Sequence, residues 1–239
     1  MNMKMMKPLT LLFLSVVALT GGLLAQGKPV PPFQIPAIRE PHHFVKLDNR
    51  FVRVLDVTVP GYDGTLYHIH ENPYFWVSIG DATLRGNNVG TAEIIPIEKK
   101  DGEVTWSPEV THRVANVVAS TFRNITVQIQ GKEDVSPGNS FRAEPKPFGY
   151  QSTTPLDNEL VNVERLILEP GESTGKYTLP KSGILIAVHD GNLRIEVPGL
   201  PASRISLKAG DFDWHTGPLT HTITNVGSAR FEAIEAVWK

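Results

Sequence analysis

Histidine pairs provide the clearest chemical signal in this sequence. The chain has 239 residues with eight histidines and no cysteine, which excludes disulfides, thiolate metal sites and a cysteine nucleophile. His68 and His70 are separated by one residue. On a β-strand such residues point to the same face, and two neighbouring imidazoles are natural metal ligands. If His112 comes from an adjacent strand, it can supply a third ligand.

Other interpretations of these residues are weaker or lack a motif. Two surface histidines are the alternative to a metal-binding pair. The sequence contains no phosphate-binding G-x-x-x-x-G-K-[ST] and no dinucleotide-binding fingerprint. A formal net charge of -2 and the lack of a Lys/Arg run indicate that nucleic acid is not a partner.

Short β-strands must position the histidines. The chain has 19 prolines and 20 glycines and lacks long helical periodicity. Alternating runs separated by turn residues predict an all-β fold of sandwich or barrel type. The runs occupy residues 50–59, 74–80, 122–130, 163–169, 183–189, 192–197 and 231–238.

Two stretches of the chain are near copies, which predicts a duplicated domain. They lie 108 to 109 residues apart and share a Gly-x-x-x-Trp sequence followed by Thr-His and Asn-Val. The first copy contains Gly102, Trp106, His112 and Asn116, and the second contains Gly210, Trp214, His221 and Asn225. We expect the tryptophans to pack in the barrel walls and the asparagines to bond turn backbone groups.

The repeat and the composition predict the domain boundaries. The two domains are expected at residues 40–131 and 158–239, joined by a Pro-rich linker at 132–157. Residues 26–39 form an N-terminal extension.

The first 25 residues have the layout of a secretory signal peptide. Lys4 and Lys7 precede a short apolar run, and small residues follow it. We expect cleavage after Ala25 and a periplasmic or secreted protein that does not contact the membrane after cleavage. An uncleaved membrane anchor is the alternative, although Gly21 and Gly22 interrupt the apolar run.

The histidine motifs resemble those of the cupin family. Gly61 precedes the His68–His70 pair by six intervening residues, where the family has five. The second family motif matches at Pro108, His112 and Asn116, with Val110 in place of a glycine and one residue missing before His112. The resemblance covers both halves and implies a bicupin with two tandem antiparallel β-barrels of the jelly-roll (double-stranded β-helix) type. It also implies a divalent transition metal, Fe, Mn, Ni or Zn, held inside the first barrel by the three histidines.

The family's glutamate ligand is missing. By spacing, this glutamate would fall at Tyr74 or Phe75. Glu71 is adjacent to His70, so on a regular strand it points to the opposite face. Glu71 could reach a metal only through a bulge, and otherwise it is a solvated acid. Tyr74 is either a hydrogen-bond donor near the site or a packed tyrosine. The chain therefore resembles the three-histidine cupins, such as cysteine dioxygenase and the diketone-cleaving dioxygenases.

The second half has lost the ligand positions. Tyr177 and Leu179 stand where the histidine pair should be, and Ile184 replaces the glutamate, so only His221 remains. We predict no metal there and no acid inside either barrel. The other histidines are expected at strand edges, turns or loops, and these are His42, His43, His189 and His215. His215 could also contact a substrate together with His221.

Three functions are compatible with this pattern. The first is an exported metal-dependent enzyme that acts on a small organic substrate, by dioxygenase-like or isomerase/lyase-like chemistry. The second is a non-catalytic cupin that binds or senses a small molecule, and the third is a structural or assembly module. The substrate, the metal and any homo-oligomer are not fixed by the sequence.

Overall fold

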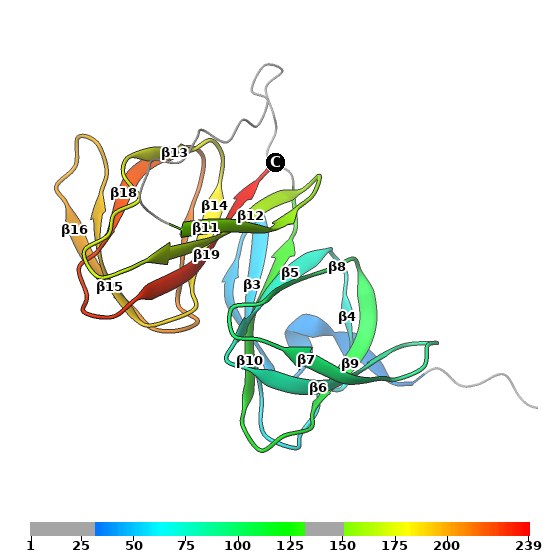
Figure 1. Cartoon of the computed structure of the whole chain (residues 1–239). Coiled ribbons are helices and arrows are strands. Elements are labelled where there is room, and N and C mark those ends of the chain that lie inside the picture. Colours follow the sequence, from blue (N-terminus) through cyan, green and yellow to red (C-terminus); the bar gives the residue numbers. More distant parts are fainter. Residues whose placement is uncertain (1–31, 132–150) are drawn as a thin grey trace, which may run out of the picture. The chain divides into compact units, whose positions relative to one another are not determined.

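The computed structural model describes residues 32–131 and 151–239 (Figure 1). The predicted signal peptide and residues 132–150 of the predicted linker lie outside these ranges. Apart from one short 3-10 helix, every regular element in the described ranges is a β-strand, which confirms the all-β prediction. In these ranges no helix has the length and apolar character needed to cross a bilayer.

The first half, residues 32–131, consists of two five-stranded sheets. Their strand orders are β1-β4-β9-β6-β7 and β2-β3-β10-β5-β8. The elements are β1 (Gln34–Pro36), η1 (Ala37–Arg39), β2 (His43–Asp48), β3 (Val52–Val59), β4 (Tyr67–His70), β5 (Tyr74–Ile79), β6 (Ala82–Asn88), β7 (Ile94–Lys99), β8 (Val104–Ser107), β9 (Val110–Asn116) and β10 (Phe122–Ile129). All pairings are antiparallel except that of β1 with β4, which is parallel.

The second half, residues 151–239, repeats this topology. Its sheets have the orders β11-β12-β19-β14-β17 and β13-β18-β15-β16. The elements are β11 (Gln151–Asp157), β12 (Val161–Leu168), β13 (Tyr177–Leu179), β14 (Gly183–Ala187), β15 (Gly191–Glu196), β16 (Ser203–Leu207), β17 (Phe212–His215), β18 (Leu219–Asn225) and β19 (Phe231–Trp238). Each strand from β2 to β10 has a counterpart nine places later in the same sheet position, so the duplication seen in the sequence is a duplication of fold.

Two strands fall in segments that the sequence assigned to an extension and a linker. β1 lies in the predicted N-terminal extension and pairs with β4, where Ile35 is opposite His68. β11 occupies the last seven residues of the predicted linker and pairs with β12. The sequence signal is weak because β1 has only three residues and β11 contains Pro155.

The sheet that contains β10 is covered on both faces. Asn124, Ile125, Val127 and Gln128 are all buried on this strand. Alternate residues must face opposite sides, so Ile125 and Val127 join an apolar cluster while Asn124 and Gln128 face the interior of the first half. The apolar cluster also contains residues of β12, β14 and β19, and we call it the shared cluster.

The repeated asparagines tie each histidine strand to nearby turns, as predicted. Asn116 Nδ2 donates to the carbonyl oxygens of Val59 and Ser120, at 3.2 and 2.6 Å. Its Oδ1 accepts from the backbone N–H of Val118. The equivalent bonds of Asn225 go to the carbonyl oxygens of Leu168 and Ala229, at 2.9 and 2.8 Å.

Candidate metal centre

Strands β4 and β9 bring the three predicted ligands together. His68 and His70 lie on the same face of β4 and are 1% and 2% exposed. His112 on β9 is directly opposite His68 in the antiparallel register. The ring centroids of His68 and His112 are 4.6 Å apart, and those of His70 and His112 are 5.2 Å apart.

His43 joins these residues, although the sequence assigned it to a strand edge and gave it no metal-binding role. It is the first residue of β2, and its ring centroid lies 4.5 Å from that of His68. Within residues 32–131 and 151–239, the group placed to share one ion is His43, His68 and His70, whose ligand atoms lie within 4.8 Å of one another. We call His43, His68, His70 and His112 the histidine cluster.

The tautomer of His68 leaves a lone pair available for a metal. Its Nδ1 lies 2.8 Å from the carbonyl oxygen of Leu66. A carbonyl can only accept, so the ring proton is on Nδ1 and the lone pair is on Nε2. Nε2 of His68 is buried and has no hydrogen-bond partner among the described residues. Leaving a buried nitrogen of this kind without a partner destabilises the folded state. A metal ion bound to Nε2 would remove this cost.

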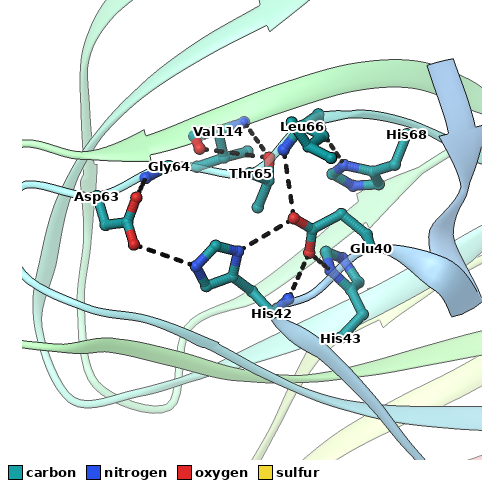
Figure 2. Close-up of polar contacts among 9 residues, drawn as sticks. All are labelled: Glu40, His42, His43, Asp63, Gly64, Thr65, Leu66, His68 and Val114. Atoms are coloured by element: carbon teal, nitrogen blue, oxygen red, sulfur yellow. Dashed lines mark hydrogen bonds and ion pairs between the residues drawn. The ribbon is translucent and has the colours of Figure 1, made fainter. Parts of the chain in front are cut away.

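Glu40 fixes the ring of His43 so that, as in His68, Nδ1 carries the proton and Nε2 carries the lone pair (Figure 2). The Nδ1 of His43 donates to Glu40 Oε2 at 2.5 Å, which leaves the Nε2 lone pair free to bind a metal. The carboxylate also accepts from the backbone N–H of His42 and Leu66, at 2.8 and 3.2 Å. Burial alone would raise the pKa of Glu40, but the hydrogen bonds from His43 and His42 outweigh it and lower the pKa to about 2. A carboxylate behind a ligating histidine fixes the ring and increases its basicity.

His42 extends this network toward the surface. Its Nδ1 lies 3.0 Å from Glu40 Oε1, and its Nε2 lies 3.3 Å from Oδ2 of the exposed Asp63 (Figure 2). Burial tends to lower the pKa of His42, but the bonds to the two carboxylates raise it overall. The imidazole therefore links an exposed acid to a buried one.

Sequence reasoning missed Glu40 and His43 because neither belongs to a histidine motif. One signal was present in the sequence Glu40-Pro41-His42-His43, since an acid three residues before a histidine can reach its ring. The contact forms because η1 ends at Arg39 and β2 begins at His43, so the chain turns at Glu40.

Replacing Glu40 should weaken metal binding without removing a ligand. In Glu40→Gln the side chain keeps its shape, but it loses the charge and one of its acceptor oxygens becomes an N–H donor. We expect the metal affinity to fall by about 10- to 100-fold, the effect of losing a partner of a ligating histidine. Metal titration against a competing chelator measures this, with Asp63→Asn as the exposed control. Unchanged affinity in Glu40→Gln would mean that the carboxylate does not position His43.

Gln128 occupies the same supporting position for His70. The Nδ1 of His70 lies 3.1 Å from the amide nitrogen of Gln128, and the amide oxygen is buried without a partner among the described residues. Turning the amide by half a rotation lets His70 Nδ1–H donate to that oxygen, and the hydrogen-bond balance favours this orientation. His70 then also presents its Nε2 lone pair.

The two positions expected for the family's glutamate point to opposite faces of β5. Tyr74 is buried and stacks on His70, with ring centroids 4.2 Å apart. Burial raises its pKa to about 12, so the hydroxyl keeps its proton. Phe75 belongs to the shared cluster. Glu71 follows the end of β4, is exposed, and lines a separate hollow with Ile69 and Arg53.

The environment keeps His68, His70 and His112 neutral. Burial, with the neighbouring His43 and His112, lowers the pKa of His68 to about 3. Burial and His43 lower the pKa of His112 to about 4, and burial lowers the pKa of His70 well below its usual value. Neutral imidazoles are the form that binds metals.

A cavity of about 60 Å³ adjoins the histidine cluster. Its apolar lining includes Val57, Val59, Leu84 and Phe122. Besides the histidines, the lining residues that carry a polar group are Thr65, Tyr74, Trp76 and Asn124. None of the cavity-lining residues is Asp, Glu, Lys or Arg.

The second half retains the geometry of the site but has different side chains. Tyr177 is opposite His221 in the same register that pairs His68 with His112, and their ring centroids are 4.6 Å apart. Leu179 stands in place of the second histidine. These substitutions leave His221 as the single imidazole at the equivalent positions.

An acid lies inside the second half, so the expectation that the interior contains none is wrong. Tyr177 Oη donates to Glu235 Oε1 at 2.6 Å, and His221 Nε2 lies 3.9 Å from the same oxygen. All three residues are buried. The sequence did not reveal this because every residue of β19 is buried, so its polarity pattern does not identify the interior face.

The remaining predicted surface histidines are partly buried and have partners. His189 Nε2 lies 3.0 Å from Asp101 Oδ2, and His215 Nδ1 donates to the carbonyl oxygen of Gly217 at 2.9 Å. Trp106 and Trp214 both pack against the shared cluster, in agreement with the packing role predicted for them.

Comparison with known proteins shows the fold. No protein-family model and no curated protein matches the sequence. AerE from Microcystis aeruginosa has a TM-score of 0.63 at 13% identity, covering 88% of this chain and 98% of that one. A cupin 2 conserved barrel domain protein from Leptotrichia buccalis has a TM-score of 0.51 at 11% identity, covering 82% and 88%. Salicylate 1,2-dioxygenase from Pseudaminobacter salicylatoxidans has a TM-score of 0.55 at 10% identity, covering 79% and 71%. With its duplicated sheets and these structural neighbours, the chain has a bicupin fold.

Proposed function

We propose that the protein is a metal-dependent enzyme that acts on a small organic substrate in its first half. The histidine cluster would hold one divalent transition metal, of the group Fe, Mn, Ni and Zn. The observation that carries this proposal is the buried Nε2 of His68, which has no partner among the described residues and lies beside two further imidazoles within ligand distance of a common ion. The bicupin fold is also found in a dioxygenase, which supports the proposal by analogy of fold only.

The residues around the cluster define what the chain contributes to such a reaction. A bound metal would polarise a substrate oxygen or provide a site for dioxygen. Glu40 and the carbonyl of Leu66 fix the rings of His43 and His68. Tyr74 stacks on His70 and keeps its proton, so its hydroxyl serves as a hydrogen-bond donor. The apolar wall excludes water from the reacting groups.

The test is reconstitution followed by turnover measurements. Purified protein is loaded separately with Fe(II), Mn(II), Ni(II) and Zn(II), and oxygen uptake and product formation are followed with a panel of small carboxylates, enols and phenols. Oxygen uptake with Fe(II) supports dioxygenase chemistry, while oxygen-independent conversion supports isomerase or lyase chemistry. His68→Ala should abolish either activity and His221→Ala should retain it. Failure to retain any metal would overturn the proposal.

A non-catalytic binding or sensing protein is the second candidate. The second half favours it, because this fold persists there with Leu179 and Tyr177 at the ligand positions. In that case the metal-loaded protein would bind small molecules in calorimetry without converting any of them. A structural module would neither retain metal nor bind such ligands.

We also propose that the protein is exported. The support is the charged, apolar and small-residue order of residues 1–25. Purified native protein should begin near Gln26, and cell fractionation should place it outside the cytosol. An intact Met1 on cytosolic protein would contradict export.

A further inference from the structure

The composition of the cavity beside the histidine cluster identifies a class of ligand. This inference rests on the proposed metal site and deepens it. We infer that the site takes a small monoanion, whose single anionic oxygen group binds the metal and whose apolar body packs against Val57, Val59, Leu84 and Phe122.

The first argument is the chemistry of the wall. Besides the histidines, the residues that line the cavity provide four aliphatic side chains, Val57, Val59, Leu84 and Val114, and three aromatic ones, Tyr74, Trp76 and Phe122. Burying a polar or charged group against such a surface without a partner costs free energy. With no Lys or Arg in the lining, a second carboxylate at the far end of a ligand would meet no cation.

The second argument is the donor set of the site. Imidazoles bind a metal in their neutral form, so a divalent ion held by histidines keeps its positive charge. Among the described residues, no Asp or Glu lines the cavity beside the histidine cluster, because the carboxylate of Glu40 lies behind His43 and accepts from its Nδ1. An anionic oxygen of the ligand therefore provides the negative charge next to the ion, whereas a neutral ligand would leave the charge of the ion uncompensated.

The third argument is size. A cavity of about 60 Å³ holds roughly four water-sized spheres. A short hydrocarbon body of about three carbons therefore fills it.

The experiment uses the full chain loaded with Zn(II), which is redox-inactive, and measures binding by calorimetry without relying on activity. The probes are acetate, butyrate, butyramide and succinate. Butyrate adds two methylene groups to acetate, butyramide removes its charge, and succinate places a second carboxylate at the end of the same four-carbon chain. We expect butyrate to bind about tenfold more tightly than acetate, because two more methylene groups are buried. Butyramide and succinate should each bind at least about tenfold more weakly than butyrate.

A matched variant tests whether this preference comes from the cavity. Val59→Leu adds one carbon to the apolar wall and should weaken butyrate binding about tenfold, while acetate binding and zinc content stay unchanged. Thermal unfolding of the variant checks that it is folded, and Val57→Ala, which enlarges the cavity, should retain butyrate. Equal binding of acetate and butyrate, or tighter binding of succinate, with zinc retained, would overturn this inference alone. Loss of zinc from the unaltered chain would overturn the metal site itself, and the inference with it.

Discussion

His68→Ala should bind its metal more than about 100-fold more weakly than the unaltered chain. Loss of a partner behind a ligating histidine already costs 10- to 100-fold, and here a ligand itself is removed. His68 is central to the cluster, because its ring contacts those of His43, His70 and His112. Metal per chain after dialysis against a weak chelator measures the effect, and about one ion per chain is expected for the unaltered protein.

The second half provides the matched control for this experiment. His221→Ala removes the histidine at the position equivalent to His112, in a setting with Tyr177 and Glu235 in place of further imidazoles. Its metal content should not change, whereas His112→Ala should lower the affinity as His68→Ala does. Metal retained in His68→Ala but lost in His221→Ala would move the site to the second half and contradict the proposal.

The metal-free protein should lose stability steeply as the pH falls from about 6.5 to about 4.5. In the unfolded chain a histidine takes up a proton near its usual pKa of about 6.5. In the folded chain burial lowers the pKa of His68 to about 3 and that of His112 to about 4. Between the folded and unfolded pKa values the unfolded state binds more protons than the folded state. The free energy of unfolding therefore decreases as the pH is lowered, by about 1.4 kcal/mol per pH unit for each histidine. The two together lose roughly 5 kcal/mol over this range, a large part of a typical folding free energy.

Other groups near the cluster affect the size of this loss. Burial shifts the pKa of His70 in the same direction and adds to it. His42 has the opposite effect, because its pKa is raised in the folded state. The stabilisation that it adds is fully present below its unfolded-state pKa and is lost as the pH rises through its folded-state pKa. Glu40 has a folded-state pKa of about 2, so it stabilises the folded state at pH values above its unfolded-state pKa. This stabilisation begins to decrease only below about pH 4.5.

Urea unfolding at several pH values, with a chelator present, measures the slope. His68→Gln should reduce it by about 1.4 kcal/mol per pH unit. Stability that stays flat between pH 6.5 and 4.5 would show that the buried imidazoles are protonated in the folded state.

The sequence carried much of the fold because strand alternation and turn residues are local signals. The run at 231–238 coincides with β19 (Phe231–Trp238), and that at 163–169 overlaps β12 (Val161–Leu168). β1 was missed because it has three residues and becomes a strand only by pairing with β4. A strand of this kind is set by a contact distant in sequence, which local pattern cannot reveal.

The part of the candidate site that depends on the alternation of side chains along one strand was predictable from the sequence. His68 and His70 share a face because they are two residues apart on β4, and Glu71 is excluded for the same reason. His43 was not predictable in this way, because its burial depends on how β2 pairs with β3 and where η1 ends. Glu235 was hidden because β19 is buried along its whole length, so polarity gave no indication of the interior face.

The shared cluster suggests why a half that has lost its ligand positions persists in this chain. Ile184 and Trp238 of the second half are buried in the same apolar cluster as Phe75 and Val127 of the first. Deleting the second half would expose that surface to water, so the first half alone should be less stable and less soluble than the full chain. The second half therefore supports the fold of its neighbour through this face, and that contribution does not depend on which side chains surround Tyr177.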